Sequence, residues 1–219
     1  PTAQLTNADT AVFRVTFSED VTNVDTSDFE FSTDGDVTGT VSSVSTISAS
    51  IYDVTITSVA GDGTLNLDVA SGDNIQDLAG NAYDDQVASE EEYNIDNTPP
   101  VIVITAPTKT SNAAITDTTI RVTDENTITA SNVTVDGATT ATTSSFSCTQ
   151  TTAAQVDCTI SIDSSGDLTI AATDDAGNSN TEEETDYVID TTAPTITTIV
   201  RSKPTAQLTN ADTAVFRVT

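Results

Sequence analysis

The fold of this chain is predicted from one repeated stretch. Its first copy reads Tyr93-Asn94-Ile95-Asp96-Asn97-Thr98-Pro99-Pro100, followed directly by Val101-Ile102-Val103-Ile104. The same pattern returns as Tyr187-Val188-Ile189-Asp190-Thr191-Thr192-Ala193-Pro194. Each copy reads as the end of one strand, an aspartate, a Thr/Pro joint and the start of another strand. Proline fixes its own φ and holds the preceding residue extended, so each joint is expected to be stiff. We interpret both copies as junctions between similar domains.

A second repetition indicates a tandem array. Residues 1–16 return unchanged as residues 204–219, and self-similarity at a fixed period is typical of repeated domains. The sequence therefore predicts one domain at 1–96, a second at 97–191 and the first strands of a third at 192–219.

The opening strand of the repeat is expected to cross between copies. In the second domain this strand is Val101–Thr105, and its counterpart is Thr195–Val200, so the first domain is expected to receive its own from the preceding repeat. Neighbouring copies of the repeat are thus the expected partners. They would be joined in one long polypeptide, which the unchanged return favours, or by strand donation between shorter chains.

Short alternating runs predict the fold class. Apolar Phe13, Val15 and Phe17 alternate with polar Arg14 and Thr16, as in a half-buried strand. Such runs are separated by turn residues, and no helical period is present. About seven runs in each domain of about 100 residues predict an all-β fold of tandem immunoglobulin-like β-sandwich domains joined end to end.

The charge excludes several classes of partner. The chain has 34 Asp and Glu against six Lys and Arg, a net charge of −28, and no His. Nucleic acids and anionic membrane surfaces require clustered Lys and Arg, so neither is expected as a partner. No run of residues predicts a signal peptide or direct membrane insertion. The acidity is interpreted either as solvation in a salt-loving organism or as divalent cation binding.

Enzymatic chemistry is not expected. Without His, the chain cannot build a Ser/His/Asp triad. Paired carboxylates of a glycosidase would need a pocket lined with aromatic residues, and aromatic residues make up only 5% of the sequence.

Two cysteines, Cys148 and Cys158, lie in a hairpin-like part of the second domain. Their context favours a disulfide over a metal pair or free thiols. Aligning the two domains matches Cys148 with Thr46 and Cys158 with Val54, which are facing positions of one hairpin.

Oxygen-rich segments are expected to meet at each junction. In an immunoglobulin-like sandwich, the loop after the second strand and the turn between the last two strands lie where the chain enters. Carboxylates and amides without His or Cys are the ligand set of Ca²⁺. Taken singly, an Asp-x-Ala-Gly-Asn segment is a tight turn and an Asp before Thr-Pro is solvated, but their joint recurrence favours Ca²⁺. The central site would combine Asp96, Asp124, Glu125, Asn126, Asp174 and Asn178. The other site would combine Asp190 of the preceding repeat with Glu19, Asp20, Asp77 and Asn81. The alignment of the two domains matches Asp124-Glu125-Asn126 with Ser18-Glu19-Asp20.

Three motifs carry a resemblance to a known family. Phe17-Ser18-Glu19-Asp20-Val21, Asp77-Leu78-Ala79-Gly80-Asn81 and Ile95-Asp96-Asn97-Thr98-Pro99-Pro100 resemble the bacterial Ig-like repeats of giant secreted adhesins and extracellular surface fibres. The resemblance implies a cell-surface or extracellular stalk, often with Ca²⁺ at its joints, whose terminal domains bind the target. The alternatives are a module that binds a surface glycan or protein, and a halophilic surface-layer component without specific calcium sites.

Overall fold

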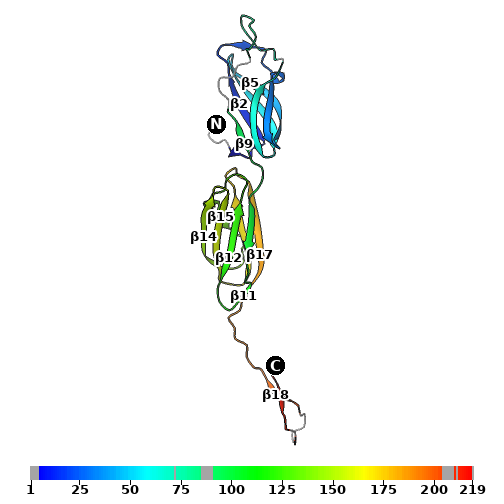
Figure 1. The fold of residues 1–219 in the computed structure, drawn as a ribbon, viewed down its shortest axis with the longest axis vertical. Coiled ribbons are helices and arrows are strands. Elements are labelled where there is room, and N and C mark those ends of the chain that lie inside the picture. The colour runs from blue at the N-terminus through cyan, green and yellow to red at the C-terminus, as the bar shows by residue number, and fades with distance from the viewer. Residues whose placement is uncertain (1–4, 72, 85–90, 204–209, 211, 219) are drawn as a thin grey trace.

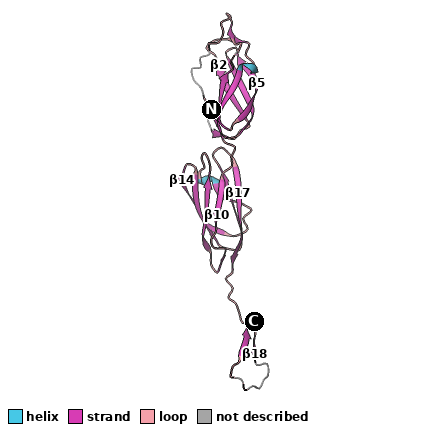
Figure 2. Ribbon diagram, turned by 45° about the vertical axis from the view of Figure 1, so that its right-hand side comes forward, coloured by secondary structure: helices cyan, strands magenta, loops and turns pink. Residues whose placement is uncertain are grey.

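The computed structural model describes residues 5–71, 73–84, 91–203, 210 and 212–218. Two β-sandwiches stand end to end along the long axis, and an extended segment leads from the second to a short hairpin (Figure 1). Strands make up nearly all of the regular structure (Figure 2). The predicted all-β fold of tandem immunoglobulin-like sandwiches is confirmed. Within the described part of the chain, no helix is long and apolar enough to cross a membrane.

The first sandwich pairs the sheet β1-β9-β7-β4 with the sheet β2-β6-β5, and a small β3-β8 ladder lies at one end. Its elements are β1 (Leu5–Thr6), β2 (Thr10–Thr16), β3 (Val21–Thr22), the 3-10 turn η1 (Thr26–Asp28), β4 (Phe29–Gly35), β5 (Thr38–Ser48), β6 (Ile51–Ala60), β7 (Gly63–Val69), β8 (Gln76–Asp77) and β9 (Tyr93–Ile95).

The second sandwich pairs the sheet β10-β12-β15-β14 with the sheet β11-β17-β16-β13. Its elements are β10 (Val101–Thr105), β11 (Thr110–Ser111), β12 (Ile115–Thr123), the 3-10 turn η2 (Ala130–Asn132), β13 (Val133–Val135), β14 (Thr143–Thr152), β15 (Gln155–Ile162), β16 (Gly166–Thr173) and β17 (Ser179–Ile189). Beyond it, β18 (Ile199–Lys203) and β19 (Val215–Val218) form the terminal hairpin.

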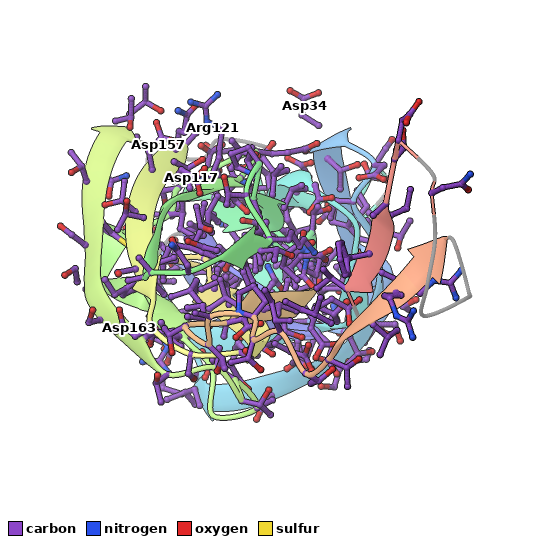
Figure 3. All side chains as sticks on the ribbon, turned by 90° about the horizontal axis from the view of Figure 1, so that it is seen from below. Asp34, Asp117, Arg121, Asp157 and Asp163 are labelled. Atoms are coloured by element: carbon purple, nitrogen blue, oxygen red, sulfur yellow. A yellow bond between two sulfur atoms is a disulfide. The ribbon has the colours of Figure 1, made fainter. Side chains whose placement is uncertain are left out.

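Period-two burial explains why these segments form strands. On β6, Tyr52, Val54 and Ile56 are buried while the residues between them lie nearer the surface, so one face of the strand supplies the core. The outward faces carry equivalent ion pairs, Arg14 with Asp53 at 2.7 Å and Arg121 with Asp157 at 2.8 Å. Figure 3 shows Arg121 and Asp157 side by side. Arg14 therefore corresponds to Arg121, and Asp53 corresponds to Asp157, when the two sandwiches are compared.

The disulfide between Cys148 and Cys158 is confirmed, and the two residues face each other across β14 and β15. One detail of the predicted alignment is wrong, because the residue that faces Val54 is Val44 and not Thr46. The counterpart of Cys148 is therefore Val44. Both β5 and β14 are Ser-rich, so matching their serines shifted the register by two residues.

Candidate metal centre at the domain junction

Three aspartates meet where the first sandwich joins the second. Asp96 follows β9, Asp124 follows β12 and Asp174 follows β16. Each offers a carboxylate oxygen, and these oxygens all lie within 4.8 Å of one another. Asp96 is 1% exposed and Asp174 is 2% exposed, while Asp124 is half-buried. The cluster combines the end of one domain with two loops of the next.

Local turns hold each carboxylate in place. The Asp174 Oδ1 atom accepts hydrogen bonds from the backbone N–H groups of Gly177 at 2.7 Å and Asn178 at 2.8 Å, and Oδ2 accepts one from Asn178 Nδ2 at 2.8 Å. Gly177 has a φ of 105°, a conformation that strains other residues. The Asp-x-Ala-Gly-Asn sequence thus forms the expected tight turn and also orients the aspartate.

Asp124 and Asp96 each leave one carboxylate oxygen without a partner. The Oδ1 atom of Asp124 accepts from Asn126 N at 2.8 Å, and the Oδ1 atom of Asp96 accepts from Thr98 N at 3.2 Å. The Oδ2 atoms of both aspartates are buried and have no hydrogen-bond partner. Burying an unpaired carboxylate oxygen is costly, so these two atoms point to a ligand.

The electrostatics of the cluster agree with this interpretation. Burial raises the pKa of Asp96, and the Asp174 carboxylate adds to that increase while the Thr98 N–H opposes it. Burial also raises the pKa of Asp124, with further increases from Asp96 and Asp174. Desolvation and like charge both disfavour the ionised form, and a bound cation would reverse both effects.

Ca²⁺ fits this donor set. It takes oxygen ligands at about 2.3–2.6 Å, so two oxygens on one ion lie at most about 5 Å apart. The carboxylate oxygens of the cluster meet this limit. Asp96, Asp124 and Asp174 would hold the ion, and backbone carbonyls or water could complete its coordination.

The predicted neighbours of Asp124 lie at the rim of the cluster. Glu125 and Asn126 are both exposed. The Glu125 charge contributes to the raised pKa of Asp124, and the Asn126 amide moderates the raised pKa of Asp96. Asn178 binds Asp174 and does not belong to the group of three carboxylates.

Hydrogen bonds cross the junction from the second sandwich. Asn178 Nδ2 donates to the Asp96 carbonyl at 2.9 Å, and Asn180 Nδ2 donates to the Pro100 carbonyl at 2.9 Å. Asn7, just after β1, donates from Nδ2 to Asn178 Oδ1 at 3.1 Å. Sequence reasoning missed Asn7 and Asn180, because an isolated Asn carries no signal of a partner in another domain.

The first sandwich holds the joint from its own side. Asp62 accepts from the Asn97 backbone N–H at 2.6 Å through Oδ1 and from the Thr98 hydroxyl at 2.6 Å through Oδ2. Asn97 Nδ2 also donates to the Gly61 carbonyl at 2.9 Å. Gly61 and Asp62 form the bend between β6 and β7, and this bend anchors the joint.

The first sandwich carries part of the second predicted site. Asp77 accepts from Ala79 N and Asn81 N at 2.8 Å each and from Asn81 Nδ2 at 2.6 Å, which reproduces the turn of Asp174. Glu19 and Asp20 are exposed. Asp190 is exposed at the far end of the second sandwich, and its Oδ1 atom accepts from Thr192 N as Asp96 does from Thr98 N.

The predicted match of Asp124 with Ser18 is wrong. The backbone N–H of Phe17 donates to the Ser50 carbonyl, and that of Asp124 donates to the equivalent Ala154 carbonyl. Phe17 therefore occupies the position of Asp124, and its ring packs edge-on against Tyr52 and Tyr83. The acidic residues follow Thr123 directly but are separated from Thr16 by Phe17 and Ser18, so aligning the acidic segments shifted the match by one residue. Among the described residues, only the central junction brings three His, Cys, Asp or Glu side chains close enough to hold one ion.

No protein-family model matches the chain, and no curated protein matches it. Similar solved structures include the Escherichia coli adhesin FdeC, at 14% identity and a TM-score of 0.40, with 80% of this chain and 62% of that chain covered. Domains 5–6 of the S-layer protein SbsC match at 19% identity and a TM-score of 0.28, covering 87% and 94%.

The Yersinia pseudotuberculosis adhesin InvE matches at 13% identity and a TM-score of 0.29, covering 92% of this chain and 64% of that chain. The chain thus spans less than two thirds of the FdeC and InvE chains. These similar structures are two adhesins and two domains of an S-layer protein.

Proposed function

We propose that the chain is a structural segment of an extracellular or cell-surface stalk, in which Ca²⁺ locks consecutive sandwiches together. The observation that carries the proposal is the pair of buried, unpartnered Oδ2 atoms of Asp96 and Asp124, which lie beside Asp174 and come from different domains. A cation bound there would connect the end of one sandwich to two loops of the next.

The chain's own residues prepare the junction for this role. The turn of Asp174 presets its carboxylate, and Asn178 and Asp62 hold the joint from opposite sides. The bound ion would supply the positive charge that removes the repulsion among the three carboxylates. The enclosed position of Asp96 and Asp174 supports a structural rather than a catalytic role.

The end-to-end arrangement supports a function in extension. Two sandwiches follow one another along a single axis, with a short proline-containing joint between them (Figure 1). Strands rise about 3.3 Å per residue, so each sandwich with its loops should advance the stalk by about 35–45 Å. A stiff junction would maintain this advance across many domains.

Small-angle X-ray scattering tests the proposed stiffening. We expect the peak for distances between the two sandwiches to stay sharp in Ca²⁺ and the distribution of distances to broaden after chelation. Asp124→Asn should give the broadened distribution in both conditions. NaCl at matched ionic strength is the control for a halophilic protein, which monovalent salt would stabilise equally well. Scattering that is identical with and without Ca²⁺ would contradict the proposal.

A further inference from the structure

The strand β2 has an open edge. In the second sandwich, the equivalent strand β12 pairs with β15 on one side and with β10 on the other. Among the described residues, β2 pairs with β6 alone. An open strand edge presents backbone N–H and C=O groups that another strand can pair with.

The core beside this edge is incompletely covered. In the second sandwich, β10 lies against β17, Ile102 of β10 is 6% exposed, and Tyr187 of β17 is 1% exposed. The counterpart of Tyr187 is Tyr93, which is only half-buried. Its ring packs edge-on against Phe13 at 5.1 Å, and its hydroxyl donates to the Val12 carbonyl of β2 at 2.9 Å. This edge therefore leaves an aromatic pair partly exposed.

The chain itself shows which segment pairs with the sequence of β2. The strand β19, Val215–Val218, repeats the residues of Val12–Val15 without change, and it pairs antiparallel with β18. In that hairpin, Ile199 lies opposite Val218 and Val200 opposite Arg217.

The complete sandwich uses the same register. Ile102 lies opposite Val122 and Val103 opposite Arg121. Ile199 therefore corresponds to Ile102. The strand that corresponds to Val101–Thr105 is therefore Ile199–Lys203, which begins further toward the C-terminus than the predicted Thr195–Val200. The difference arises because the joint after Asp190 is longer than the joint after Asp96.

We infer that the open edge of β2 accepts, as an antiparallel strand, the segment Ile199–Lys203 of a neighbouring copy of the repeat. Val200 then lies opposite Arg14, and Ile199 lies opposite Val15. Ile199, which is 61% exposed in the hairpin, takes the buried position that Ile102 holds in the second sandwich. This strand pairing connects consecutive copies of the repeat and does not depend on bound Ca²⁺.

A thiol crosslink tests both the pairing and its register. The probe is a synthetic peptide of residues 195–203 with Cys in place of Val200, and the acceptor is the full 219-residue chain carrying Arg14→Cys. The matched control is Arg121→Cys, because it occupies the same position in a sandwich whose edge β10 already covers. With about ten micromolar peptide, we expect the disulfide to form on the order of a hundredfold faster at position 14, since a bound strand holds the thiols at an effective concentration of about millimolar.

Two further measurements separate pairing from chance collisions. A peptide that also carries Ile199→Asp should lose the preference for position 14, because its charge would enter the core. Mass spectrometry should locate the peptide on the cysteine introduced at position 14. Equal crosslinking at positions 14 and 121, or a preference that survives Ile199→Asp, would overturn the inference.

Discussion

Asn178 donates a hydrogen bond from its side-chain amide to the backbone carbonyl of Asp96 at 2.9 Å, across the junction between the two sandwiches. The same amide also donates to the Asp174 carboxylate at 2.8 Å. One side chain therefore positions a candidate metal ligand and attaches the joint that carries another. This arrangement couples the geometry of the site to the angle between the domains.

Replacing Asn178 should loosen the junction. Asn178→Ala removes the hydrogen bonds to Asp96 and Asp174, and each lost bond should cost about 1 kcal/mol in the free energy of unfolding of the second sandwich. Asn81→Ala is the control, because Asn81 caps the equivalent turn of the first sandwich through Asp77. Broader scattering profiles should follow from Asn178→Ala alone. Identical broadening by both variants would show that turn stability, and not the contact across the junction, controls the angle.

The raised pKa values of Asp96 and Asp124 predict opposite pH effects with and without metal. A folded-state pKa above the unfolded value of about 3.9 means that the folded chain holds the proton more tightly. The resulting stability is present below the unfolded pKa and is lost as the pH rises through the folded pKa. In metal-free buffer, the wild type should therefore lose stability relative to Asp124→Asn as the pH rises above about 4.

In the presence of Ca²⁺, protons compete with the metal for the same carboxylates, so the affinity should fall as the pH falls through the raised pKa values. Thermal unfolding across this range, with and without Ca²⁺, measures both effects. A difference between wild type and Asp124→Asn that does not change with pH would contradict the assignment of the raised pKa values.

The disulfide should act as a local staple. The double variant Cys148→Val with Cys158→Val copies the facing pair Val44 and Val54 of the first sandwich. We expect it to fold and to lose about 2–3 kcal/mol in the free energy of unfolding, because the bridge closes a short loop. Urea denaturation measures the loss. Native protein whose cysteines react with a thiol reagent would contradict the bridge.

The sequence was sufficient to predict the all-β tandem fold and the disulfide pair. Alternating burial on strands such as β6 follows directly from the residue pattern, and the Asp-Ala-Gly-Asn turn is encoded locally. The joining of Asp96 with Asp124 and Asp174 also follows from the predicted topology, although metal binding there stays a prediction.

Register within the polar segments could not be predicted. Phe17, and not Ser18, stands at the position of Asp124, because Phe17 and Ser18 separate Thr16 from the acidic residues whereas Asp124 follows Thr123 directly. Val44 stands where Thr46 was expected, because Ser- and Thr-rich strands with bulges tolerate several alignments. The contacts of Asn7 and Asp62 depend on how two domains meet, which no local pattern encodes.

Isothermal titration calorimetry of Ca²⁺ into metal-free protein at fixed ionic strength measures directly whether the junction binds Ca²⁺. We predict binding heat in the wild type with a dissociation constant of about 10⁻⁴–10⁻³ M or tighter, the range of extracellular modules. Asp124→Asn should lose this heat, whereas Asp163→Asn should retain it, because Asp163 is an exposed aspartate outside the cluster. Absence of Ca²⁺-dependent heat in the wild type, or equal heat in Asp124→Asn, would contradict a calcium-locked junction.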